Sequence, residues 1–87
     1  MPSAVVLINC DIGREQEVVD HICSLDGVEK AYLVYGVYDV VAVITAATME
    51  GLEAILMQKV RPLQGVKATM TLMISRDCAP RERAERI

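Results

Sequence analysis

The chain has 87 residues, with nine Lys and Arg against twelve Asp and Glu, and it lacks Phe and Trp. A chain of this length builds one domain around one core, and its formal net charge of −3 argues against the clustered basic surface that nucleic-acid binding requires. Three cysteines without CxxC spacing do not fit a secreted disulfide framework. No apolar run approaches the roughly 20 residues of a membrane span, so the sequence predicts a cytoplasmic protein.

The first part of the chain predicts a strand, a helix and a second strand. Residues 4–8 form an apolar, β-branched run that ends at Asn9 and Asp11, which is typical of a buried strand followed by a turn. Residues 14–25 place their apolar side chains on one helical face, and Gly27 ends this helix, as a glycine at a helix C-terminus commonly does. Residues 28–35 then form the second strand.

The rest of the chain repeats this order and ends in a tail. Residues 40–46 form a strand that the short turn at residues 36–39 joins to the preceding strand, which makes a hairpin. Thr48 is the expected N-cap of a second helix, which Pro62 and Gly65 close. Residues 66–75 form the last strand. We therefore expect one domain over residues 1–75 and a charged C-terminal tail over residues 76–87.

A shift of 38 residues places the second part of the chain on the first. Gly13 falls on Gly51 and Gly27 on Gly65, and the segments LDGV and LQGV coincide. Two strand–helix–strand units give the order βαββαβ. Because connections between parallel strands of one sheet are nearly always right-handed, both helices lie on one face of a four-stranded antiparallel sheet. This is the ferredoxin-like α+β fold.

The other face of this sheet needs a cover. Residues 4–8 and 40–44 are apolar on both faces, whereas a strand with one face in water alternates apolar and polar residues. Roughly eight apolar side chains, or ~400–500 Å², would stand on the open face, which is near the limit for a monomer. At about 25 cal/mol per Å², covering it yields on the order of 10 kcal/mol per subunit before association costs. The sequence predicts a dimer that forms through the open sheet face.

No metal site, cofactor site or catalytic site is predicted. His21 and Cys23 are two positions apart on a helix, so they point in different directions and cannot hold one ion. Asp20, next to the same histidine on a helix, cannot orient it as the base of a catalytic triad. We therefore expect the protein not to be an enzyme.

The hairpin turn is the segment most suited to binding a ligand. Its glycine and aspartate, Gly36 and Asp39, are explained equally well as hairpin chemistry and as exposed amides beside a carboxylate that hold the charged groups of an amino acid. In the last strand, Thr69 and Thr71 share one face, opposite Met70. Their hydroxyls serve either as filler between strands or as hydrogen-bond donors to a ligand.

The ordered set of motifs resembles a known family. The segment LDGVEKAYLVYGVYDVVAVITA, followed by a helix and then LQGVKATMTLMIS, is similar to the effector-binding and assembly (RAM-type) domain of the Lrp/AsnC transcription regulators. The resemblance implies dimers that form through their sheets and join into rings, with small effectors, often amino acids, bound between dimers near the G-x-Y-D turn. It gives ligand-binding roles to five residues: Gly36, Tyr38, Asp39, Thr69 and Thr71.

The chain begins two residues before its first strand, so we expect a stand-alone effector domain. Such a domain would not bind DNA itself but would act with copies of itself, a small effector and, as a further partner, a full-length relative that binds DNA. Three alternatives share the topology: an ACT-like amino-acid-binding domain, for which Gly13 lies at the relevant loop, a small dimeric α/β-barrel enzyme, and a purely structural assembly module.

Overall fold

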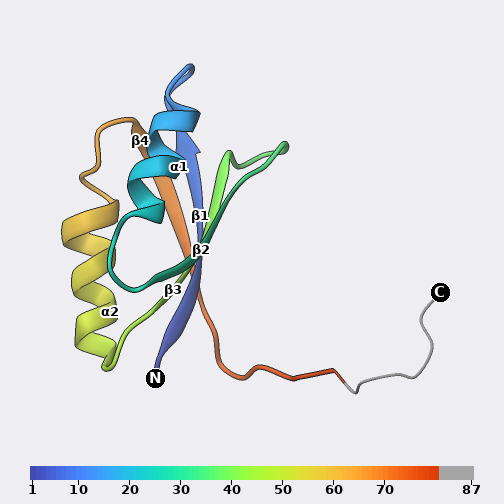
Figure 1. The fold of residues 1–87 in the computed structure, drawn as a ribbon, viewed down its shortest axis with the longest axis vertical. Helices are drawn as coiled ribbons and strands as arrows, with labels where there is room; N and C mark the ends of the chain where they lie inside the picture. Colours follow the sequence, from blue (N-terminus) through green and yellow to red (C-terminus); the bar gives the residue numbers. More distant parts are fainter. Residues whose placement is uncertain (81–87) are drawn as a thin grey trace.

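The computed structural model of the chain describes residues 1–80 and has the predicted βαββαβ order (Figure 1). The elements are β1 (Ser3–Cys10), α1 (Glu15–Cys23), β2 (Val28–Leu33), β3 (Val40–Thr45), α2 (Met49–Ile55) with its π-helical continuation η1 (Leu56–Val60), and β4 (Val66–Met73). The predicted ferredoxin-like fold class is confirmed. The second and fourth strands each end two residues earlier than the apolar pattern predicted, at Leu33 and Met73.

The four strands form one sheet in the order β2-β3-β1-β4, and every neighbouring pair is antiparallel. Both helices cover the same face (Figure 1). In the central pair, Val5 lies opposite Val43, and these two residues are also equivalent under the 38-residue shift. The two halves of the chain are therefore related by an approximate twofold axis that passes between β1 and β3.

The core lies between the sheet and the helices because the central strands alternate. Along β1 and β3, every second residue is buried, as the twofold period of a strand requires. The helices contribute Val18, Ile22, Leu52 and Val60, which are fully buried. Each such side chain stabilises the fold by roughly 1.5–3 kcal/mol through removal from water. The fully buried strand residues are Ala4, Val6, Ile8, Val40, Ala42 and Ile44.

The second helix begins at its predicted cap and ends in an unusual turn. The Thr48 hydroxyl accepts a hydrogen bond from the Gly51 amide at 3.0 Å, which satisfies one of the free donors of the first turn. At the other end, the Arg61 amide donates to the Leu56 carbonyl at 3.0 Å, the i to i+5 pairing of a π-helix. This wider turn changes the direction in which Arg61 leaves the helix relative to a regular α-helix.

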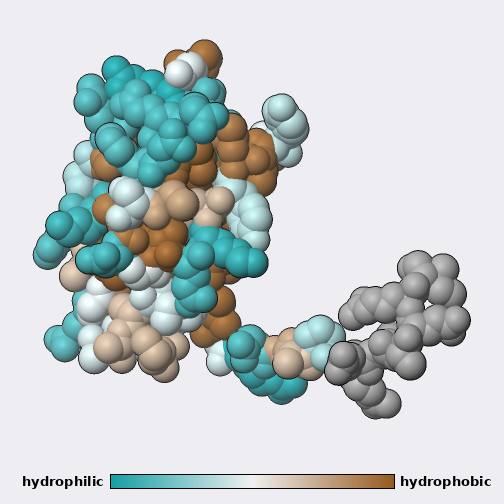
Figure 2. All heavy atoms as spheres, viewed as in Figure 1, coloured by the Kyte–Doolittle hydropathy of each residue, from teal (hydrophilic) through white to brown (hydrophobic). Residues whose placement is uncertain are grey.

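The face of the sheet opposite the helices is apolar, and no helix or strand among the described residues covers it. We call it the open face. Tyr32, Met70 and Leu72 are 48%, 49% and 48% exposed there, and Lys30 is the basic residue among them. In Figure 2, hydrophobic residues reach the surface on that side of the body, below the tip of the β2–β3 hairpin. Its central residues are Val5, Leu7, Val41 and Val43.

Beyond β4 the chain leaves the body. Ile74 still donates a backbone hydrogen bond to the Ser3 carbonyl at 3.0 Å, and the following residues to position 80 are exposed. Figure 1 shows this segment extending away from the domain on the side opposite the helices. The remainder of the predicted tail, residues 81–87, lies outside the described residues. Within the described part of the chain, no helix has the length and apolar character needed to cross a membrane.

Candidate functional site

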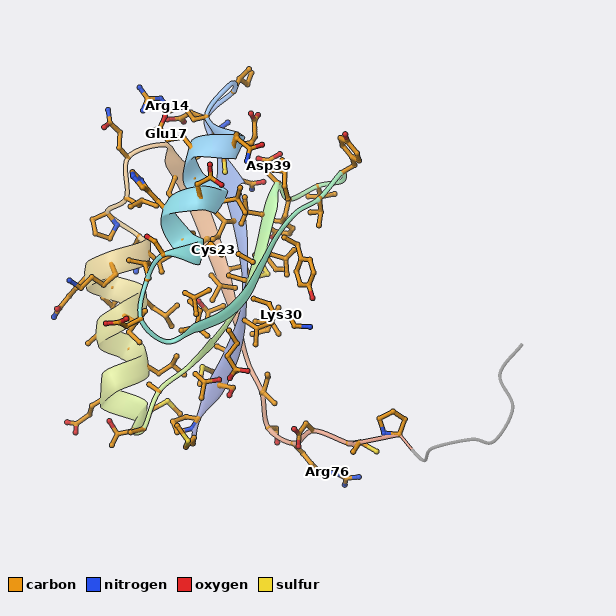
Figure 3. All side chains as sticks on the ribbon, viewed as in Figure 1. Arg14, Glu17, Cys23, Lys30, Asp39 and Arg76 are labelled. Carbon is orange, nitrogen blue, oxygen red and sulfur yellow. The ribbon has the colours of Figure 1, made fainter. Side chains whose placement is uncertain are left out.

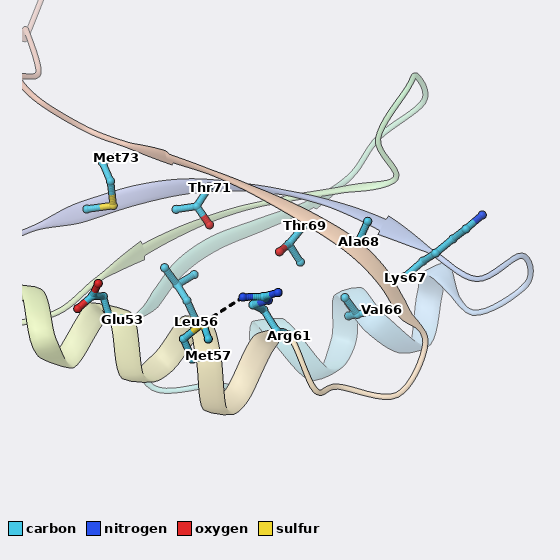
Figure 4. A pocket seen from close by; sticks show the side chains of 10 residues that line it. All are labelled: Glu53, Leu56, Met57, Arg61, Val66, Lys67, Ala68, Thr69, Thr71 and Met73. Carbon is cyan, nitrogen blue, oxygen red and sulfur yellow. Dashed lines mark hydrogen bonds between the residues drawn. The ribbon is translucent and has the colours of Figure 1, made fainter.

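A groove of about 670 Å³ runs between β4 and the second helix. Strand β4 is an edge strand, so the groove is open on the side where no further strand continues the sheet. Figure 4 shows side chains from both walls converging on it. The groove is lined by Glu53, Leu56, Met57, Arg61, Val66, Lys67, Ala68, Thr69, Thr71 and Met73.

Thr69 and Thr71 both point from β4 into this groove (Figure 4). They pair with Ile8 and Val6 of β1, whose side chains face the helices, whereas Met70 pairs with Leu7 on the open face. The prediction that the two threonines share a face opposite Met70 is therefore correct. Their hydroxyls give the groove two groups that can donate or accept a hydrogen bond.

The helix wall carries two opposite charges that were not predicted. Glu53 and Arg61 line the groove, and the Arg61 guanidinium contacts the Met57 sulfur at 3.2 Å (Figure 4). Within residues 1–80 the ion pair formed is Arg14–Glu17, so Glu53 and Arg61 have no charged partner there. The i, i+4, i+8 spacing of residues 53, 57 and 61 on one helical face is the signal that could have identified this wall.

The hairpin turn forms an exposed tip that projects from the body (Figure 1). Tyr35 and Val37 are almost completely exposed, and an added Cβ at Gly36 would meet no atom within 4 Å. Gly36 is therefore available to a ligand or a second molecule. The tip lies well away from the groove, because β4 is at one edge of the sheet and β2 at the other.

Asp39 lies at the base of the hairpin, beside the end of β1 (Figure 3). Its carboxylate accepts a hydrogen bond from the Cys10 amide at 2.8 Å, and its own amide donates to the Ile8 carbonyl at 2.9 Å. This contact ties the hairpin to β1 where the pairing of β1 shifts register. The carboxylate thus has a structural role, although its partner is a β1 amide rather than an amide of the turn.

Burial and nearby carboxylates, including that of Asp39, also change the pKa of the Cys10 thiol. Burial, followed by the negative charges of Asp39, Glu15 and Asp11, raises the pKa of Cys10 from 9.0 to about 11. Cys10 is 6% exposed. It is therefore a neutral core residue at physiological pH. Cys23 and Cys78 are exposed.

Tyr38 reaches over the open face. Its hydroxyl lies 3.6 Å from the Met70 sulfur, and Met70 is on the face of β4 opposite Thr69 and Thr71. The sheet therefore separates Tyr38 from the two threonines. Of the five residues predicted to bind a ligand, the structure brings together Thr69 and Thr71 in the groove, and Gly36, Tyr38 and Asp39 in and beside the hairpin. One chain does not bring the two groups together.

Comparison with known proteins identifies the family. The family model described as "Lrp/AsnC ligand binding domain" matches residues 3–83. An uncharacterized HTH-type transcriptional regulator of Pyrococcus furiosus is 31% identical over 74 residues, which are 82% of this chain and 49% of the regulator. The chain thus spans about half the length of this curated relative.

Solved structures of other proteins have the same fold as this chain. A protein of Thermus thermophilus is 36% identical and superposes with a TM-score of 0.84 over 93% of this chain and 100% of its own. Escherichia coli AsnC has the same fold, with a TM-score of 0.84 over 94% of this chain and 56% of its own, at 19% identity. The P. furiosus relative is named as a transcriptional regulator, and the matching family model describes a ligand-binding domain. The chain belongs to the Lrp/AsnC family, as a ligand-binding domain of its transcription regulators.

Proposed function

We propose that this domain binds an amino acid at a boundary between two subunits. In this arrangement the groove of one chain, with Thr69 and Thr71, receives the ligand, and the hairpin of another chain, with Gly36, Tyr38 and Asp39, closes over it. The observation that carries the proposal is the separation of the two groups within one chain. A site that uses both groups requires two chains.

The composition of the groove supports a ligand with two opposite charges and an apolar side chain. Arg61 offers a guanidinium that suits a carboxylate, Glu53 offers a carboxylate that suits an ammonium group, and the two threonines add hydroxyls. Leu56, Met57 and Met73 give the same groove an apolar wall. Free amino acids combine these properties. The transcriptional regulator of Neisseria meningitidis, which shares the fold at 10% identity and a TM-score of 0.80, was solved as a complex with L-Met, so L-methionine is a reasonable first probe.

A screen with the twenty amino acids tests this function. The melting temperature of the full chain should rise with at least one of them, because a ligand that binds only the folded state stabilises it by mass action. Calorimetric titration of that amino acid should then show a lower affinity for the variant Thr69→Val/Thr71→Val, which keeps side-chain volume but removes both hydroxyls. The control is the melting temperature of the variant without ligand, which should stay close to that of the parent chain. No response to any amino acid would reject amino-acid binding.

We propose further that two copies associate through the open face. Val5, Leu7, Val41 and Val43 form a continuous apolar strip on the two central strands, and the half-exposed Tyr32, Met70 and Leu72 widen it. An apolar patch of this extent marks an interaction site. A second identical sheet gives a self-complementary cover, as in the isologous interfaces of most dimers.

This chain is similar to about half of a transcriptional regulator, and this similarity indicates the biological context. With a net charge of −3, the domain is not suited to bind duplex DNA by itself. We propose that its ligand response reaches DNA through association with a DNA-binding relative, using the same open face. Co-purification of the two chains after joint expression tests this proposal, and a Tyr32→Asp chain that co-purifies equally well would contradict it.

A further inference from the structure

The segment after Ile74 is the part of the described chain that extends away from its own domain. We call residues 75–80 the arm. All six are exposed, and within residues 1–80 the side chains of the arm form one hydrogen bond, from Cys78 to the adjacent Ala79 carbonyl. Figure 3 shows Arg76 at some distance from the body, and Lys30 projecting from the sheet on the side opposite the helices. The arm therefore leaves the sheet edge toward the side on which the open face lies.

We propose that the arm crosses to a second copy of the chain and lies along the rim of its open face, where Glu29 and Lys30 stand. This inference rests on the proposed association through the open face. It adds a contact that the sheets alone do not provide, since each subunit would hold its partner with a segment that is unsupported in the isolated chain.

The arm is long enough to make this contact. Asp77 and Cys78 are the third and fourth residues of the arm, so in an extended chain they can lie about 10–13 Å from its start, whereas stacked sheets lie about 10 Å apart. The arm starts at the β4 edge, so both residues can reach a facing sheet whose β2 lies over β4.

The charges at the two ends of this contact are complementary. The arm carries Arg76 and Asp77 in succession, and the rim of the sheet carries Glu29 and Lys30 in succession. Glu29 accepts a hydrogen bond from the Thr45 hydroxyl, which in turn bonds the Ser3 hydroxyl at 2.7 Å. Lys30 lies opposite Val43, so a second sheet would place its charge at the border of an apolar interface, where an unpaired charge is costly. Asp77 of a partner's arm would neutralise it.

Similarity to other proteins includes this segment. The family model continues to residue 83, beyond the end of β4 at Met73. The superposition on the T. thermophilus chain covers 93% of the residues, which is a larger share than residues 1–73 make up. The arm thus belongs to the part of the chain that relatives share.

Disulfide trapping in the full chain tests the contact. Cys23→Ser removes the other exposed thiol, and Lys30→Cys places a thiol on the rim, so that Cys78 of the arm has one designed partner. Mild oxidation at micromolar protein should give a covalent dimer on a non-reducing gel, and peptide mapping should join position 30 to Cys78. The matched control, Asp20→Cys in the same background, puts the new thiol on the exposed face of α1, where no such linkage should form.

The outcomes separate this inference from the proposed association. A chain that sediments as a monomer contradicts both. A non-covalent dimer in which position 30 and Cys78 stay reduced, or join only within one chain, overturns the arm contact alone. As a second measurement, Asp77→Lys should raise the dimer dissociation constant by about tenfold, and adding Lys30→Glu should restore it; loss that the second change does not restore would also overturn the proposal.

Discussion

Cys10 is a buried thiol whose pKa is raised to about 11 by burial and by the negative charges of Asp39, Glu15 and Asp11. Because the unfolded chain releases this proton near pH 9.0 and the folded chain keeps it, the folded state loses stability relative to the unfolded state as the pH rises from about 9 to about 11. We expect the free energy of unfolding of the parent chain to fall more steeply over this range than that of Cys10→Ala. Urea unfolding at several pH values measures both slopes, and equal slopes would show that the Cys10 thiol is not buried as described.

Asp39 combines a structural contact with a proposed ligand contact, and two substitutions separate them. Asp39→Ala removes the acceptor of the Cys10 amide and should cost about 1–3 kcal/mol of stability. Asp39→Asn keeps an acceptor oxygen at the same position and should cost less. If the carboxylate also holds a ligand ammonium group, both variants should bind the amino acid roughly 10- to 100-fold more weakly.

Calorimetric titration of both variants, together with their melting curves, distinguishes these roles. An Asp39→Asn chain that binds the amino acid as tightly as the parent would remove Asp39 from the ligand site and leave it the structural role alone.

Among the elements, the connections from helix to strand depend on glycine. Gly27 has φ +92°, and a Cβ there would lie 2.9 Å from the Thr45 carbonyl oxygen and 2.9 Å from the Ile55 side chain. Gly13 has a similar φ of +88°, but a Cβ there would meet nothing within 4 Å. Both alanine substitutions should cost about 1–2 kcal/mol for the left-handed backbone, and Gly27→Ala should cost about 1–3 kcal/mol more for the close approach.

Chemical denaturation of the two variants measures the difference. Because φ is nearly the same at both positions, the comparison isolates the contact of α2 and β3 with the loop before β2. Equal destabilisation by the two substitutions would mean that Gly27 is required only for its dihedral angle.

Most of the elements could be predicted from residue patterns, for physical reasons that differ between them. The continuous apolar, β-branched runs of β1 and β3, the apolar face of α1 and the Thr48 cap are local signals, so they survive in the folded chain. The early end of β2 and the π turn at Leu56–Val60 have no marker in the local pattern of apolar residues. The 38-residue repeat predicted the topology because the two halves bury apolar side chains at equivalent positions.

The candidate site could be predicted only in part. The turn and the threonines were identified, since glycine, aspartate and hydroxyl groups stand out in apolar strands. Their relative positions were not, because Tyr38 lies over one face of the sheet and the threonines lie on the other. Glu53 and Arg61 were missed, because charged residues on a helix usually face solvent and become part of a groove only once β4 is placed beside them.

At the scale of the whole molecule, substitutions on the open face should have different effects in a dimer, where a second sheet covers this face, and in a monomer, where it is exposed. Tyr32 and Met49 are 48% and 50% exposed in the single chain, but Tyr32 lies on the open face and Met49 at the start of α2. If the protein were a monomer, Tyr32→Asp and Met49→Asp should have similar small effects on its stability and none on its association. If a second sheet covers the open face, Tyr32→Asp buries a charge and should raise the dimer dissociation constant by about tenfold or more.

Sedimentation equilibrium of the parent chain and the two variants measures this difference. The parent and Met49→Asp should remain dimers, or multiples of a dimer, at micromolar concentration, while Tyr32→Asp shifts toward the monomer. A parent chain that is a folded monomer at that concentration would exclude association through the open face.

The central claim, that the ligand site forms between two chains, is tested most directly by mixing two defective variants. Asp39→Asn alters the hairpin and leaves the groove intact, whereas Thr69→Val/Thr71→Val alters the groove and leaves the hairpin intact. Each variant alone should bind the stabilising amino acid weakly. After the two are unfolded together and refolded, some boundaries combine an intact hairpin with an intact groove, so calorimetric titration should recover a fraction of sites with the parent affinity. Binding that stays as weak in the mixture as in either variant alone would contradict a site shared between chains.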